Sequence, residues 1–209
     1  MELEVEAKLV APSAAALARL PGAAESLGYH LGEPERVMVV DHYLDTEDLN
    51  LHRAGWALRL RDLGTRKLLT LKERVPPRDG IAKRREYEQE VHWDEDSGWA
   101  IPQDVLEGRL RDLLHDSSLA PLFLVRQDRT LFPLAADTGE WCEVALDRVA
   151  WEAAAGTETA FEAELELYRG DETWLRKVAE ELRAELGWEP GAVSKYERGL
   201  ALAGLAPSA

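Results

Sequence analysis

Residues 2–10 read Glu-Leu-Glu-Val-Glu-Ala-Lys-Leu-Val, so charged and apolar residues alternate. Successive side chains of a β-strand point to opposite faces, and this alternation therefore predicts a strand with one charged and one apolar face. Late in the chain, residues 160–168 repeat the pattern as Ala-Phe-Glu-Ala-Glu-Leu-Glu-Leu-Tyr. Three glutamates in a row on one strand face repel each other and need cations nearby. These two acidic rows would be neighbours in a barrel that closes from its first strand to its last.

Six further stretches between these two have the pattern of strands. They cover residues 36–45, 56–62, 66–74, 83–93, 122–132 and 140–150. Helices are predicted over residues 14–27, 97–116 (mixed with loop), 171–187 and 192–203, with a short helical or turn segment at 47–54. Eight amphipathic strands predict an α+β fold, an eight-stranded antiparallel β-barrel with helices packed on the outside, because closure removes free sheet edges.

The apolar faces of these strands must then be covered from outside by the helices, since the charged faces would line the barrel interior. The residues expected on the outer face are Leu58, Leu60, Leu71, Val144, Leu146, Leu165 and Leu167. In the helix at 171–187, the spacing of Trp174, Val178 and Leu182 predicts one apolar stripe that packs onto the barrel wall.

The composition suits one packed domain, since 45% of the 209 residues are hydrophobic. We expect this domain to span residues 1–203 and the tail at 204–209 to fray. Cys142 is the only cysteine, so no internal disulfide can form, and a cytoplasmic location is expected. The sequence does not start like a signal peptide, and no apolar run approaches the roughly 20 residues of a membrane helix.

The net charge of −15 argues against nucleic acids and anionic membranes as partners. Net charge describes only the long-range electrostatic potential of the protein. A local group of arginines and lysines can still bind a polyanion inside an acidic protein. Such groups occur on the predicted polar faces. The cations are Arg59 and Arg61 on one strand, Lys72 beside Thr70 on the next, and Arg84 on the third, whose polar face also carries Glu86, Glu88 and Glu90.

Together the acidic and basic rows describe a receptor for a phosphate chain. Converging carboxylates form the oxygen-rich site that Mg²⁺ or Mn²⁺ prefers. Arginine binds phosphate oxygens through two parallel hydrogen bonds, and lysine acts as a compact positive charge. Enclosed in one channel, a metal site and rows of cations would bind a chain of phosphates.

Each row also has a plainer interpretation. A single Glu-x-Glu-x-Lys strand is usually a solvated face, and residues 162–166 alone could protect a sheet edge. Arg59 and Arg61 could simply form salt bridges with Glu86 and Glu88. The joint occurrence of charged rows on at least five strands is harder to explain in these terms.

The motifs occur in an order that resembles a known family. Residues 4–8, Glu-Val-Glu-Ala-Lys, resemble the ExExK signature of the CYTH superfamily, also called triphosphate tunnel metalloenzymes. Further segments that resemble the family follow at 41–46, 49–61, 70–72, 84–88, 129, 143–147, 162–170 and 194–196. The resemblance covers residues 2–202. Two departures are Ala7, where many members have Arg or Lys, and Val40, where some thiamine triphosphatases have Arg.

This resemblance implies an eight-stranded tunnel that binds a divalent metal and hydrolyses a linear triphosphate. The implied metal ligands for Mg²⁺ or Mn²⁺ are Glu4, Glu6, Glu162, Glu164 and Glu166. The implied substrate-binding residues are Lys8, Arg59, Arg61, Lys72, Arg84, Arg129 and Lys195. The residues expected to take part in catalysis are Lys8, Arg59, Arg61, Glu86 and Glu88.

The substrate remains open at this stage between inorganic tripolyphosphate and an organic triphosphate such as thiamine triphosphate. One alternative is a class IV adenylate cyclase, although the sequence has no adenine-binding motif. A second alternative is a polyphosphate-binding module without turnover. Many paired carboxylates favour an enzyme, because they repel a bound anion unless a metal lies between them. A monomer or homodimer is expected.

Overall fold

The computed structural model describes residues 2–78, 80–93, 98–99, 106–114 and 117–205. Parts of two predicted segments, the mixed loop and helix at 97–116 and the tail at 204–209, lie outside the described residues. Among the described residues, no helix is both long and apolar enough to cross a membrane.

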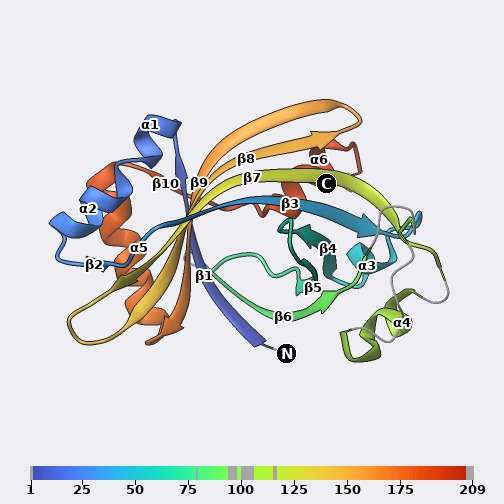
Figure 1. Ribbon diagram of the computed structural model, residues 1–209, viewed down its shortest axis with the longest axis horizontal. Helices are drawn as coiled ribbons and strands as arrows, with labels where there is room; N and C mark the ends of the chain where they lie inside the picture. Colours follow the sequence, from blue (N-terminus) through green and yellow to red (C-terminus); the bar gives the residue numbers. More distant parts are fainter. Residues whose placement is uncertain (1, 79, 94–97, 100–105, 115–116, 206–209) are drawn as a thin grey trace.

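Eight strands form a closed antiparallel barrel, as predicted (Figure 1). They are β1 (Glu2–Ala11), β3 (Glu35–Asp45), β4 (Trp56–Asp62), β5 (Lys67–Glu73), β6 (Ile81–Val91), β7 (Ala120–Ala135), β8 (Trp141–Ala153) and β9 (Gly156–Arg169). The order around the barrel is β1-β6-β5-β4-β3-β7-β8-β9, and β9 pairs back onto β1. The two acidic rows are therefore neighbours, with Glu6 opposite Glu166 and Lys8 opposite Glu164.

Two short strands that the sequence did not predict extend the sheet. β2 (His30–Leu31) pairs with the end of β7, and β10 (Glu189–Pro190) pairs with β1 at Leu9 and Val10. Two residues are too few to show a period of two, so alternation cannot identify such strands.

The helices lie outside the barrel wall or over one end of it. They are α1 (Ala14–Leu17), α2 (Leu20–Ser26), α3 (Asn50–Arg53), α4 (Arg109–Leu114), α5 (Glu172–Leu186) and α6 (Lys195–Leu202). The single helix predicted at 14–27 is two helices, and Pro21 lies in the first turn of the second, where its missing N–H costs nothing. Asp171 caps α5 by accepting a hydrogen bond from the Trp174 amide, and Gly187 ends it with φ 69°.

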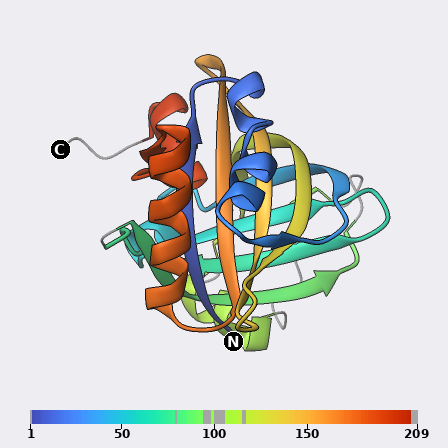
Figure 2. The same ribbon diagram turned by 90° about the vertical axis from the view of Figure 1, so that its left-hand side faces the viewer.

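Two of the three apolar clusters lie on the outside of the barrel, as predicted. Leu165 and Val144 pack with Val178 and Leu182 of α5, beside α1 and α2 (Figure 2). On another part of the wall, the leucines of β4 and β5 pack with Leu110 of α4. Outward burial of the leucines leaves the alternate residues of each strand facing the interior.

The third cluster fills one end of the barrel interior, which the sequence analysis had treated as wholly polar. Tyr43, Phe123 and Trp151 share their strand faces with inward-pointing polar residues, and Tyr196 and Leu200 of α6 pack onto them. At Gly199, a Cβ atom would lie 2.0 Å from the Phe123 ring, so α6 approaches this closely only because the position is glycine. Helix α6 thus covers the apolar end of the barrel.

Candidate functional site

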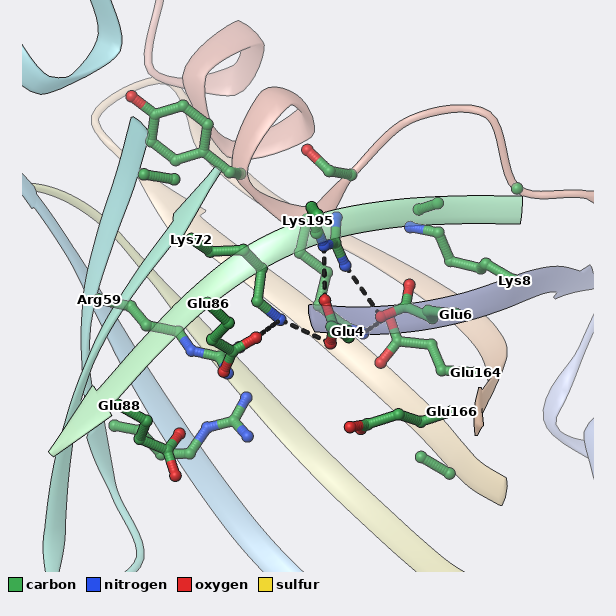
Figure 3. A pocket seen from close by; sticks show the side chains of 18 of the residues that line it. Glu4, Glu6, Lys8, Arg59, Lys72, Glu86, Glu88, Glu164, Glu166 and Lys195 are labelled. Carbon is green, nitrogen blue, oxygen red and sulfur yellow. Dashed lines mark hydrogen bonds and ion pairs between the residues drawn. The ribbon is translucent and has the colours of Figure 1, made fainter. Parts of the chain in front are cut away.

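The remaining interior is a cavity of about 920 Å³, lined by all eight barrel strands and by the segment 191–197 (Figure 3). All but one of the predicted site residues line it. These are Glu4, Glu6, Lys8, Arg59, Arg61, Lys72, Arg84, Glu86, Glu88, Arg129, Glu164, Glu166 and Lys195. The exception, Glu162, is 3% exposed and does not line the cavity, but its carboxylate lies 3.7 Å from the Lys8 amine and 3.5 Å from that of Lys195.

The acidic row of β1 is bound by cations from β5 and β6. Arg84 lies opposite Glu4 in the β1–β6 pair and donates to it at 2.6 Å, while its second nitrogen donates to Glu6 at 2.9 Å. Lys72 donates to the other oxygen of Glu4 at 2.9 Å. Burial alone would raise the pKa of Glu4, but Lys72 and Arg84 lower it to about 2. Glu4 is therefore a carboxylate at any physiological pH.

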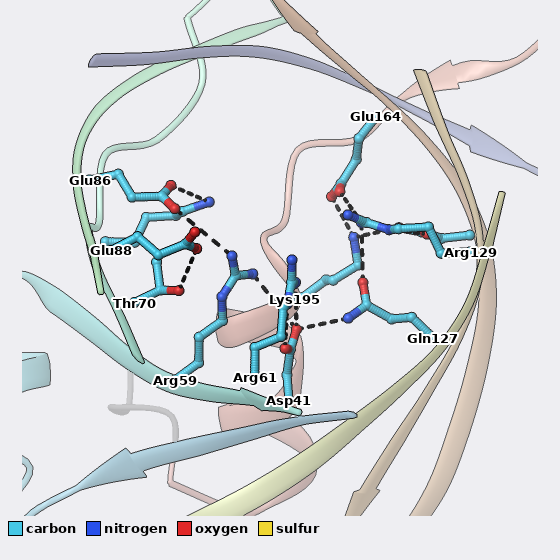
Figure 4. Close-up of polar contacts among 12 residues, drawn as sticks. Asp41, Arg59, Arg61, Thr70, Glu86, Glu88, Gln127, Arg129, Glu164 and Lys195 are labelled. Carbon is cyan, nitrogen blue, oxygen red and sulfur yellow. Dashed lines mark hydrogen bonds and ion pairs between the residues drawn. The ribbon is translucent and has the colours of Figure 1, made fainter. Parts of the chain in front are cut away.

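Two arginines of β4 are aligned by one buried carboxylate on β3 (Figure 4). Asp41 accepts two hydrogen bonds from Arg61, at 2.7 and 2.8 Å, and lies 3.7 Å from Arg59. Burial opposes its charge, but these arginines hold the pKa of Asp41 well below its usual range. The Nε of Arg59 is buried without a hydrogen-bond partner in the structure, so this guanidinium has an unused donor beside the cavity.

A second cationic group lies across the cavity, where β7, β9 and α6 meet. Arg129 binds Asp147 through two hydrogen bonds, at 2.7 and 2.6 Å, and donates to Glu164 at 2.8 Å. Lys195 donates to Glu164 at 2.5 Å and lies 3.0 Å from Asp147. Burial would raise the pKa of Glu164, but Lys195 and Arg129 hold it well below the usual value.

Gln127 connects the two cationic groups. Its amide nitrogen donates to Asp41 at 2.8 Å, and its oxygen accepts from Arg129 at 3.2 Å. The sequence analysis assigned no site role to Asp41, Gln127 or Asp147. Alternation places all three on the inner face, but their partners depend on strand register, which alternation does not give. They act here as buried partners that hold the cavity cations in place.

The residues predicted to assist catalysis occupy different parts of the wall. Lys8 donates to the carbonyl of Val193 at 2.6 Å and so connects β1 to the segment before α6. Glu86 lies 2.8 Å from Lys72 and 4.0 Å from Arg59. Glu88 accepts a hydrogen bond from Thr70 at 3.0 Å.

The cavity holds more carboxylates than its cations compensate. Glu166 points into the cavity beside Glu6 and Glu164 (Figure 3). Burial, together with Glu4, Glu86 and Glu6, raises the pKa of Glu166 to about 7, against the opposing effect of Lys72. Burial also raises the pKa of Glu6. A cation in addition to the side chains would relieve this crowding.

Among the described residues, no three histidine, cysteine or acidic side chains are arranged so that they could hold a metal ion. Several of the cavity carboxylates are bound instead to arginine or lysine, namely Glu4, Glu6, Glu86 and Glu164. The glutamates of β1 and β9 still suit a hard divalent cation, since such ions prefer carboxylate oxygens. Two of these glutamates, Glu6 and Glu166, are the crowded ones.

Several solved structures share this fold. One is an adenylyl cyclase candidate from Hippeastrum, described as having a dominant triphosphatase activity, with 22% identity, a TM-score of 0.68 and coverage of 95% of each chain. An adenylate cyclase candidate from Bacillus halodurans has 21% identity, a TM-score of 0.66 and coverage of 95% of this chain and 98% of its own. The Mimivirus capping enzyme triphosphatase has 11% identity, a TM-score of 0.52 and coverage of 90% of each chain.

The comparison of sequence with family models agrees with the fold. A model described as the CYTH domain matches residues 2–200, which is nearly the whole chain. The chain therefore belongs to the CYTH domain family.

Proposed function

We propose that the chain hydrolyses a linear triphosphate inside the barrel, with Mg²⁺ or Mn²⁺ as cofactor. The observation that carries this proposal is the convergence of seven cations on one cavity that also holds the acidic rows of β1 and β9. The cations are Lys8, Arg59, Arg61, Lys72, Arg84, Arg129 and Lys195. Proteins named as triphosphatases share the fold, which supports the same reaction class.

Substrate binding rests on cations that are already positioned. Arg59 and Arg61 are aligned by Asp41, and Arg129 and Lys195 by Asp147, so little side-chain freedom remains to be lost when phosphate oxygens replace water. Phosphoryl transfer needs mainly correct positioning and neutralisation of charge. The terminal nitrogens of Arg59 lie no closer than 3.7 Å to Asp41 and 4.0 Å to Glu86, so they could bind a phosphate oxygen without the loss of a short hydrogen bond.

The metal would be held by Glu4, Glu6 and Glu164, with Glu162 and Glu166 as further carboxylates of the same rows. When bound, a divalent cation supplies charge neutralisation and lowers the pKa of a water molecule that attacks the terminal phosphorus. Arg84 and Lys72 now neutralise Glu4, and Lys195 neutralises Glu164. A bound triphosphate would compete for these cations and leave the carboxylates available as ligands.

Glu86 and Glu88 have positioning roles in this proposal. Glu86 holds Lys72 and lies near Arg59, so it fixes two of the cations that bind phosphate. Glu88 orients Thr70 on the neighbouring strand. Lys8 donates to the Val193 carbonyl in the structure and would donate to a phosphate oxygen of the substrate instead.

Release of phosphate from tripolyphosphate tests the proposal, measured with Mg²⁺ or Mn²⁺ and again with excess chelator. We expect release that depends on the metal. Release that persists in chelator would contradict the proposed use of a metal. Incubation with ATP and Mn²⁺ then tests the sequence-based alternatives: cyclic AMP would identify a cyclase, and tight binding without any product would identify a binding module.

A further inference from the structure

The barrel wall is incomplete at one corner. The pairing of β1 with β9 ends at Glu6 opposite Glu166. Before Glu6, β1 pairs only with β6, and after Glu166, β9 pairs only with β8. The two strands diverge toward these ends (Figure 1). The cavity reaches the surface between these unpaired ends, beside the acidic rows, since Leu3 of β1 and Tyr168 of β9 both line it and are both exposed.

Apolar side chains flank this opening. Leu3 on one side and Tyr168 on the other are 58% and 54% exposed, and both line the cavity. Trp141 stacks on Tyr168, with ring centroids 4.6 Å apart and an interplanar angle of 14°. Only five large hydrophobic side chains are exposed among the described residues, and two of them lie here. Exposed apolar groups beside a ligand cavity indicate a contact surface for that ligand.

We propose that Tyr168 and Trp141, with Leu3 opposite, bind a flat aromatic ring carried by the substrate, whose phosphates lie in the tunnel. This inference rests on the proposed function and narrows the substrate to an organic triphosphate. Tyr168 lies two residues beyond Glu166, about 7 Å along the strand, at a bulge in the β8–β9 pair, and both residues line the cavity. A ring there would extend from phosphates that contact the acidic row, and would stack on the aromatic pair.

The aromatic residues at the other end of the cavity do not provide such a surface. Tyr43, Phe123 and Tyr196 are each only 4–5% exposed. Their ring centroids lie 4.8 to 6.1 Å from one another, inside the apolar cluster that α6 covers. The exposed stack at Tyr168 is therefore the better candidate for an external ring.

A comparison of substrates with and without a ring tests this proposal. KM and kcat are measured for tripolyphosphate, ATP and thiamine triphosphate with wild type, Tyr168→Ser and Tyr168→Phe. We expect Tyr168→Ser to raise the ratio of KM for a ring-bearing substrate to KM for tripolyphosphate about tenfold, as loss of one stacking contact does elsewhere. Tyr168→Phe should restore the wild-type ratio. ATP and thiamine triphosphate distinguish a neutral ring from a cationic one.

Met38→Ser is the matched control, because Met38 is 62% exposed on β3 and does not line the cavity. It should keep the wild-type ratio. An unchanged ratio in Tyr168→Ser, or the same change in Met38→Ser, would overturn the proposal.

A binding measurement separates this inference from the proposed function. Calorimetric titration with the same three compounds reports the ratio of dissociation constants even if nothing is hydrolysed. If wild type and Tyr168→Ser show no turnover but differ in this ratio, the ring site stands and hydrolysis fails. If tripolyphosphate is hydrolysed while neither KM nor Kd ratio responds to Tyr168→Ser, hydrolysis stands and the ring site fails.

Discussion

Asp41 accepts two hydrogen bonds from Arg61 across the β3–β4 pair, at 2.7 and 2.8 Å, in a part of the barrel where Asp41 is completely buried. The same carboxylate lies 3.7 Å from Arg59 and accepts a hydrogen bond from Gln127. One acidic side chain thus orients two cations of the cavity. The stability of this part of the barrel and the binding of phosphate depend on the same group.

Asp41→Asn should destabilise the fold by roughly 3–5 kcal/mol, because it leaves two buried guanidinium groups without their counter-ion. Urea unfolding at pH 7 measures this change. Asp128→Asn is the matched control, since Asp128 binds Arg36 through two hydrogen bonds but on the exposed surface. A loss of no more than about 1 kcal/mol is expected there. Equal losses in the two variants would contradict the role of Asp41.

Kinetics should separate the two kinds of cavity residue. Arg59→Ala removes a phosphate-binding cation and should raise KM for tripolyphosphate roughly 10- to 100-fold. Glu164→Gln removes a proposed metal ligand and should lower kcat more than it changes KM. Arg126→Ala on β7, which breaks an exposed pair with Glu152 of β8, should leave both constants near wild type. Mild and equal effects of Arg59→Ala and Glu164→Gln would support the interpretation of these residues as a solvated strand face.

The stability of the metal-free protein should depend on pH through Glu166. Its pKa is raised to about 7 by burial and by the nearby Glu4, whereas an unfolded glutamate titrates near pH 4.3. The folded state therefore holds this proton more tightly, and stability falls as pH rises from about 4.5 to 7. In chelator, the free energy of unfolding of wild type should fall between pH 5 and pH 8, and this fall should be roughly 1–3 kcal/mol smaller in Glu166→Gln. Glu33→Gln, at an exposed loop position, is the control and should show the same dependence of stability on pH as wild type. The same dependence in Glu166→Gln would contradict the crowding of Glu166.

Addition of Mg²⁺ at pH 8 should raise the stability of wild type, because the folded carboxylates bind the ion better than the unfolded chain does. At 100 times the dissociation constant the gain is about 2.7 kcal/mol. Thermal unfolding with Mg²⁺ and with chelator measures it without any substrate. Glu164→Gln should gain less than wild type. An identical gain in both would assign the ion to another site.

Gly199→Ala should destabilise the closed end of the barrel by about 1–3 kcal/mol, because its Cβ would overlap the Phe123 ring at 2.0 Å. Gly22→Ala in α2 meets nothing within 4 Å and should be neutral or slightly stabilising. Urea unfolding of the two variants tests how closely α6 packs. A neutral Gly199→Ala would show that the helix can move away from the barrel at little cost.

Much of this architecture was predictable because alternation is a local signal. It predicted all eight barrel strands, the inward direction of Arg59 and Arg61, and the outward direction of Leu58 and Leu60, since each needs only a few consecutive residues. The closed barrel also followed, because closure removes free sheet edges, and the closure of β1 on β9 makes the two acidic rows neighbours. The cytoplasmic location, the monomer or homodimer and the domain limits 1–203 stay predictions.

What the sequence could not predict depends on contacts between distant segments. The ion pairs of Asp41 with Arg61 and of Asp147 with Arg129 require the register of β3 on β4 and of β7 on β8. The apolar end under α6 was missed because the interior was expected to be polar throughout. Phe123 shares a strand face with Arg129, and only the packing of Tyr196 shows that this end of the interior is apolar. Patterns within one strand carry no information on such partners.

Phosphorus NMR of tripolyphosphate mixed with an equal amount of protein, before and after addition of Mg²⁺, tests the central claim most directly. Before the metal is added, we expect the resonances of bound but intact tripolyphosphate. After addition, these resonances should be replaced by those of orthophosphate and pyrophosphate. Cleavage in chelator, or tripolyphosphate that stays intact after Mg²⁺ and Mn²⁺ are supplied, would contradict a metal-dependent triphosphatase.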